Sequence, residues 1–186
     1  MIQALSNIFT GFGLSASAGL NAYIPLLIVA LLGRFTHLIQ LKPPYDALTS
    51  VWVIVILAVL VLVEAFLDKI PAVDTVYNVI QSLARPAAGA ILFAASSHVV
   101  SDIHPVLALI CGILIAGSVH VAKTTARPVI TMATAGAGNP VVSTAEDVVA
   151  AVTSLLSVLM PIVALVLIVA GVLLIIRALQ RRRVQA

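Results

Sequence analysis

The sequence predicts an all-α membrane protein, a polytopic bundle of about six transmembrane helices plus a short interfacial amphipathic helix. Three observations predict this class. The 186 residues are 62% hydrophobic and only 9% charged, whereas about a quarter of the residues in soluble domains are charged. The apolar residues form long runs separated by short polar stretches. Two runs hold Gly, Asn and Pro close together, which predicts two helices broken near the middle of the membrane.

Six apolar runs are candidates for membrane helices. They cover residues 8–32, 51–67, 86–100, 105–121, 128–149 and 154–176. Crossing ~30 Å of hydrocarbon takes about 20 residues, so a chain of 186 residues has room for about six short-looped helices. We therefore expect one transmembrane domain over residues 1–186, with no separate soluble domain.

Lysine and arginine residues are unequally distributed between the two sides of such a bundle. With about six crossings, one side receives only Arg34 and Lys42. The other side receives Lys69, Arg85, Lys123, Arg127, Arg177, Arg181, Arg182 and Arg183. Because short cytoplasmic loops are enriched in Lys and Arg, we expect both termini to lie in the cytoplasm.

Residues 71–84 carry apolar side chains at helical spacing, among them Val73, Tyr77 and Ile80. Pro71 suits the first turn of a helix, where an N–H has no intrahelical partner. The pattern predicts a short amphipathic helix at the cytoplasmic interface. The alternative is a continuation of the preceding helix, bent at Pro71.

The first, third and fifth apolar runs are rich in Gly, Ala and Ser. Small residues let membrane helices approach closely, and packing must hold such helices together because lipid provides no hydrophobic force between them. We therefore expect these three helices to form the centre of the bundle. The bulkier helices 51–67 and 154–176 would surround them.

Two of the small-residue stretches share a motif, ASAGLNAYIP at residues 16–25 and ATAGAGNPVV at residues 133–142. Pro25 removes the N–H that would bond the Asn21 carbonyl in a helix, and Pro140 acts in the same way in the second stretch. Polar groups at this depth need partners, because each unsatisfied group in hydrocarbon costs several kcal/mol. Paired Gly- and Pro-interrupted helices are typical of transporter binding sites.

These considerations predict a substrate-binding site between the two broken helices. Its expected residues are Gly19, Asn21, Gly136, Gly138 and Asn139. The carbonyls of Asn21 and Gly136 would contribute to it. One alternative is that the two asparagines only join helices through hydrogen bonds. Another is that residues 128–149 form a re-entrant hairpin.

Glu64 and Asp68 are four residues apart and share one face of the helix over residues 51–67 and its continuation. Carboxylates inside a membrane are costly, and such residues are functional candidates. We expect a coupling or gating role for them, together with Arg85 and Arg127. The alternative is that these arginines neutralise the carboxylates, or that the side chains reach the interface.

Other chemistry is weakly supported. His98, Asp102 and His104 have a spacing that could chelate a divalent metal, but no fourth ligand lies near them in the sequence. We expect no metal and no cofactor. The lone cysteine, Cys111, excludes an intrachain disulfide. Because the sequence holds no nucleophile elbow, phosphate-binding loop or HExxH motif, we also expect no enzymatic activity.

Three segments, AGLNAY, VEAFLDKIPAVD and TARP followed by TAGAGNP, give the chain a family likeness. It resembles a family of small bacterial integral-membrane proteins described only as a domain of unknown function. The resemblance covers nearly the whole chain and implies a protein of the bacterial inner, or cytoplasmic, membrane. It implies no activity, substrate or site residue.

The sequence therefore predicts a membrane transporter or channel that moves a small solute or ion through a site framed by two broken helices. The alternative function is a scaffold or accessory subunit that binds partner helices through its small-residue faces. The expected partners are the lipid bilayer, the small solute or ion and further copies of the chain. No nucleic acid is expected, because helix-end topology explains the +3 net charge.

Overall fold

The computed structural model describes residues 2–67, 71–97 and 104–184, and these residues form α-helices, one short 3₁₀ helix and no β-strand. The elements are α1 (Ile2–Leu20), α2 (Tyr23–Phe35), the 3₁₀ helix η1 (Tyr45–Thr49), α3 (Val51–Leu67), α4 (Pro71–Ser97), α5 (Pro105–Thr134), α6 (Asn139–Leu159) and α7 (Pro161–Val184). The prediction of an all-α fold is confirmed.

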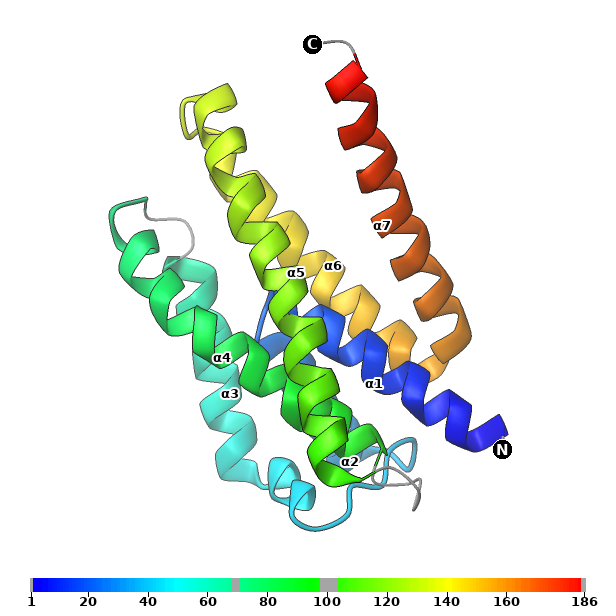
Figure 1. Ribbon diagram of the computed structural model, residues 1–186. Helices are drawn as coiled ribbons and strands as arrows, with labels where there is room; N and C mark the ends of the chain where they lie inside the picture. Colours follow the sequence, from blue (N-terminus) through cyan, green and yellow to red (C-terminus); the bar gives the residue numbers. More distant parts are fainter. Residues whose placement is uncertain (1, 68–70, 98–103, 185–186) are drawn as a thin grey trace.

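Helix α1 lies at the centre of the bundle and packs against α4, α5, α6 and α7 (Figure 1). The chain reverses after Leu20, and α2 returns toward the end of the bundle at which α1 begins. The helices from α3 to α7 then run between the two ends in alternating directions. As a result, α1 begins at one end of the bundle and α7 ends at the other.

Close packing around α1 depends on small residues. A Cβ atom added at Gly13 would clash with Ser157 of α6, and one added at Gly89 of α4 would clash with Ala116 of α5. The Ser15 hydroxyl donates a hydrogen bond of 2.9 Å to the Gly89 carbonyl. These close approaches explain why α1 and α4 are rich in Gly, Ala and Ser, as packing must supply the attraction between membrane helices.

The stretch over residues 128–149 was expected to form one membrane helix broken near its middle, but in the structure it is divided between two helices. Helix α5 ends at Thr134, and residues 135–138 form a turn before α6 begins at Asn139. Gly136 takes a left-handed conformation with φ of +85°, which suits glycine and commonly ends a helix. The second Gly-rich motif is therefore the connection between two helices.

Helix α4 replaces two expected elements, the interfacial helix 71–84 and the membrane helix 86–100. It runs without interruption through Pro86. Prolines are tolerated inside membrane helices when neighbouring groups satisfy the backbone. Residues Val79–Ser96 of this helix are long and apolar enough to cross a membrane.

Residues 79–83 of α4 present their apolar side chains outward. Ile80 is 56% exposed and Leu83 is 76% exposed, whereas Gln81 is fully buried. Outward apolar and inward polar residues are the arrangement expected of a helix surrounded by lipid. The spacing that predicted an interfacial helix therefore belongs to a continuous helix.

Helix α5 is also longer than the expected helix 105–121, because it continues through Pro128 to Thr134. Lys123 and Arg127, the residues expected at a membrane boundary, both lie inside it. Each of them forms an ion pair with Glu146 of α6, at 2.9 and 2.8 Å respectively. This pairing lets two cations remain within a helix that was expected to end before them.

The expected helix 154–176 is divided in the structure. Helix α6 ends at Leu159, and α7 begins at Pro161 after one intervening residue. Proline cannot continue a helix in the regular way but suits the first position of a new one.

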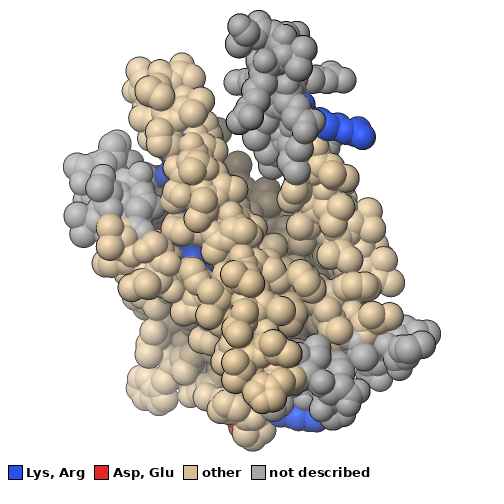
Figure 2. All heavy atoms as spheres, viewed as in Figure 1, with Lys and Arg blue, Asp and Glu red and all other residues tan. Residues whose placement is uncertain are grey.

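Three helical stretches are long and apolar enough to cross a membrane, namely Val79–Ser96, Pro105–Thr134 and Asn139–Leu159. Shorter apolar helices cover Tyr23–Phe35, Val51–Leu67 and Pro161–Leu173. Figure 2 shows that uncharged residues dominate the described part of the visible face, with Lys and Arg at few points. Together these features indicate a membrane protein.

Candidate functional site

The junction between α1 and α2 is built around Asn21. The Asn21 N–H still bonds the Ser17 carbonyl at 3.1 Å, as in a regular helix. Its side-chain oxygen, however, accepts hydrogen bonds of 3.0 Å from the N–H groups of Tyr23 and Ile24. Asn21 thus caps the start of α2 with its side chain. The Leu20 carbonyl consequently loses Ile24 N–H, the partner it would have in a continuous helix.

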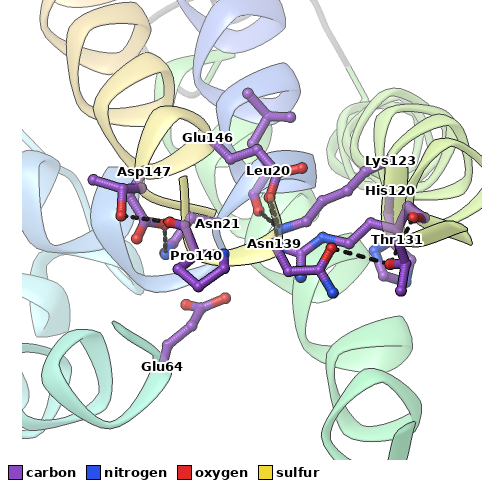
Figure 3. A network of polar contacts seen from close by, with 12 residues as sticks. Leu20, Asn21, Glu64, His120, Lys123, Thr131, Asn139, Pro140, Glu146 and Asp147 are labelled. Atoms are coloured by element: carbon purple, nitrogen blue, oxygen red, sulfur yellow. Dashed lines mark hydrogen bonds and ion pairs between the residues drawn. The ribbon is translucent and has the colours of Figure 1, made fainter. Parts of the chain in front are cut away.

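Lys123 of α5 supplies the missing partner. Its ammonium group donates a hydrogen bond of 2.9 Å to the Leu20 carbonyl, and its Nζ lies 2.9 Å from Oε2 of Glu146 (Figure 3). Arg127 Nη2 lies 2.8 Å from the same carboxylate oxygen. A cation at the carboxyl end of a helix interacts favourably with the exposed carbonyls and the helix dipole. The junction is therefore a charged site formed by α1, α5 and α6.

Asp147, the neighbour of Glu146, closes the other side of the junction. Its Oδ1 accepts a hydrogen bond of 2.9 Å from the Asn21 amide nitrogen. Asn21 thus connects the start of α2 to a carboxylate of α6 (Figure 3). An acidic group near the amino end of a helix is also electrostatically favourable.

A second group of buried polar residues lies between α3, α4 and α5. Arg85 Nη2 lies 3.1 Å from Glu64 Oε1, and both side chains are only 1% exposed. Arg85 Nη1 also donates a hydrogen bond of 3.0 Å to Nδ1 of His120. His120 and Lys123 are three residues apart on α5, so they share one face of that helix. The Glu64–Arg85 pair and the Lys123–Glu146 pair therefore lie next to each other along one face of α5.

A cavity of about 540 Å³ opens at the end of the bundle where α1 begins. It extends to Leu14 of α1 and Val29 of α2. Polar side chains from three parts of the chain contribute to its wall, among them Asn7, Thr10, Gln40, Lys42 and Ser96. Polar side chains therefore line part of a cavity that borders both α1 and α2.

The structure brings several of the expected site residues together. Asn21 lies at the junction, and Gly19 packs so closely on α5 that an added Cβ atom would clash with Val119. Glu64 and Arg85 form the buried ion pair that was the alternative to a coupling role. Arg127 also belongs to the site, through Glu146.

Other expected site residues lie in the turn between α5 and α6. Asn139 Oδ1 accepts a hydrogen bond of 3.0 Å from the Thr131 hydroxyl, rather than joining Asn21. The Gly136 carbonyl accepts from the Asn139 N–H at 3.2 Å, so the turn itself occupies the group that Pro140 was expected to free. Gly138 closes the same turn and precedes the first residue of α6.

Four further candidates contribute no observed site. Asp68, His98 and Asp102 lie outside the described residues. His104 is exposed, and its Nδ1 accepts a hydrogen bond of 3.3 Å from Val106 N–H at the start of α5. Among the residues that the structure describes, no group of His, Cys, Asp and Glu could hold a metal ion.

Sequence reasoning missed four members of the site, which are His120, Lys123, Glu146 and Asp147. Lys123 was expected only among the basic residues of the cytoplasmic side, and the other three residues were given no role. A signal was available, because ionisable residues inside apolar runs are functional candidates by default. The expected helix ends concealed part of it, because Lys123 lies between the expected helices 105–121 and 128–149.

The all-α fold with its long apolar helices indicates an α-helical membrane protein. The chain belongs to the family described as a domain of unknown function (DUF4126), which it matches over residues 8–181. The resemblance seen in the sequence is therefore confirmed. No curated protein and no solved structure matches the chain.

Proposed function

We propose that the protein is a membrane transporter or channel, and that a small solute or ion passes through the site at the α1–α2 junction. The observation that carries the proposal is the pair of helix ends at Asn21, with the Leu20 carbonyl held by a side chain from another helix. Interrupted helices whose ends face charged groups are typical of transport sites. The depth of this junction in the membrane is part of the proposal.

The charged groups around the junction support the same function. Glu64, Glu146 and Asp147 supply negative charge, while Arg85, Lys123 and Arg127 supply positive charge. Ionisable side chains within membrane helices usually face one another or a pathway, because isolated charges there are costly. We propose that the Glu64–Arg85 pair couples or gates movement at the junction, since His120 and Lys123 connect the two groups along α5.

We also propose a place for the protein in the bacterial inner membrane, with the end of α7 in the cytoplasm. Arg177 lies near that end, and Lys and Arg favour the cytoplasmic side. The beginning of α1 lies at the opposite end of the bundle (Figure 1), whereas the sequence predicted both termini on one side. The difference follows if α1 and α2 together enter the membrane and return to the same side, so that they do not count as a crossing.

A homo-oligomer is part of the proposal. A single chain of 186 residues forms a thin wall around any pathway through its centre. Several copies would surround such a pathway more completely.

Flux through purified protein in liposomes tests the proposed function. We expect a panel of small ions and polar solutes to include at least one that enters proteoliposomes faster than empty liposomes, with or without an imposed membrane potential. A Gly171→Ala variant should carry the same flux, because no atom lies within 4 Å of its added Cβ. Absence of flux for every solute of the panel would contradict transport and favour the scaffold function, with capture of partner helices as its assay.

A further inference from the structure

The Lys123 ammonium group lies at the carboxyl end of α1, a position at which interrupted membrane helices can bind a cation from solution. In transporters with interrupted helices, unwound carbonyls and the carboxyl ends of half-helices coordinate cations. Here the Leu20 carbonyl ends α1, and Glu146 Oε2 lies at the same distance of 2.9 Å from Nζ. These two oxygens come from α1 and α6, while the cation that they hold is carried by α5.

The opposite helix end is closed to anions. The first N–H groups of α2 would be the natural ligands of an anion. Those of Tyr23 and Ile24 already bond the Asn21 side-chain oxygen at 3.0 Å. An anion would have to displace this amide, whereas a cation would only replace one positive group with another.

The charges of Lys123, Arg127 and Glu146 favour a monovalent ion. Glu146 is shared between Lys123 and Arg127, so the three groups together carry one net positive charge. Exchange of the ammonium group for a monovalent cation leaves this balance unchanged. A divalent ion would add an uncompensated charge in a partly buried site, which is costly.

We infer that the Leu20 carbonyl and the Glu146 carboxylate form a binding site for a monovalent cation, which the Lys123 ammonium group occupies as a tethered competitor. The inference rests on the proposed function, since it names the substrate class of the same site. Lys123 has a flexible four-carbon stem, so its ammonium group can withdraw without movement of α5. The Glu146 side chain is 15% exposed, which leaves a route for an incoming ion.

Thermal unfolding of the full chain in detergent tests this inference. Na⁺, K⁺ and NH₄⁺ chlorides are titrated against choline chloride at equal ionic strength, since choline is too large for a site of this size. Lys123→Met removes the tethered charge while keeping the length of the side chain. We expect small cations to raise the Tm of this variant at concentrations about tenfold or more below those needed by the wild type, because a competitor has been removed.

Lys123→Arg is the matched control, because it keeps a positive charge and should retain the wild-type titration. Equal titrations of the wild type and Lys123→Met, or equal effects of choline and the small cations, would overturn the inference. If Lys123→Met does not fold, Glu146→Gln provides the second test. That change should remove the cation-specific shift of the wild type, and a shift that persists would overturn the inference.

The results separate this inference from the proposed function. A cation-specific shift without flux in proteoliposomes would support the site and contradict transport. Flux of a neutral solute without any cation-specific shift would contradict the site and leave transport supported.

Discussion

Replacing Arg85 with methionine is expected to lower the free energy of unfolding by about 3–5 kcal/mol, because it leaves the buried Glu64 carboxylate without its cation. The two side chains are 1% exposed and 3.1 Å apart, so water cannot replace the lost partner in the folded protein. The change also removes the hydrogen bond to His120. A loss of this size is a large share of the 5–15 kcal/mol that typically separates folded from unfolded proteins.

Denaturant or thermal unfolding in detergent measures this effect. Arg34→Met is the matched control. Arg34 is exposed, donates a hydrogen bond to the Thr49 carbonyl and lies over the Phe35 ring, so its loss should cost about 1 kcal/mol or less. The double variant Glu64→Leu with Arg85→Met should recover much of the loss, because both charges are then absent. A double variant that is destabilised by the sum of the two single changes would contradict the account of this pair.

Replacing Gly112 with alanine should cause a loss of about 1–3 kcal/mol or more through overpacking where α4 crosses α5. Its Cβ atom would clash with the Gly89 carbonyl oxygen and lie 2.6 Å from the Ala90 Cα. Both are backbone atoms of α4, so no side chain can rotate away to make room. The two helices would have to separate along their line of contact.

Gly171→Ala is the control for this prediction, because the same substitution meets no atom within 4 Å on α7. Alanine has a higher helix propensity than glycine, so this variant should be as stable as the wild type or up to about 1 kcal/mol more stable. Thermal unfolding of both variants in one detergent makes the comparison. Equal stability of Gly112→Ala and Gly171→Ala would show that the α4–α5 contact is not tightly packed.

The sequence was sufficient to predict an all-α protein and its family, because composition and apolar runs reflect the membrane environment directly. It also singled out Asn21, beside which α1 ends at Leu20. Pro25 and the neighbouring small residues provide that signal locally. The depth of this junction in the membrane stays a prediction, because the chain alone does not define where the bilayer lies.

The helix ends that the sequence misplaced depend on distant contacts. Lys123 and Arg127 have the spacing of a membrane boundary, but Glu146 of another helix pairs with both within the bundle. Periodicity along one helix cannot reveal such a partner. Because Glu146 was given no role within the expected helix 128–149, the charged part of the site was not predicted.

The two similar motifs of the sequence have different structures for a local reason. Both place Asn close to Pro, but in the second Ala135 and Gly136 take left-handed conformations directly after the end of α5. Asn139 then begins α6 and bonds Thr131 within the turn. Asn21 instead bonds Asp147 and caps α2. The similar motifs therefore form different local structures, a helix junction at Asn21 and an interhelical turn before Asn139.

Comparison of Asn21→Ala with Asn139→Ala in the proteoliposome flux assay tests most directly that the α1–α2 junction is the transport site. Both variants lose one side-chain amide, so they form a matched pair. We expect Asn21→Ala to abolish flux in a protein that still folds, because the cap of α2 and the bond to Asp147 are lost, while Asn139→Ala retains most of it. Wild-type flux in a folded Asn21→Ala variant would contradict a pathway through this junction.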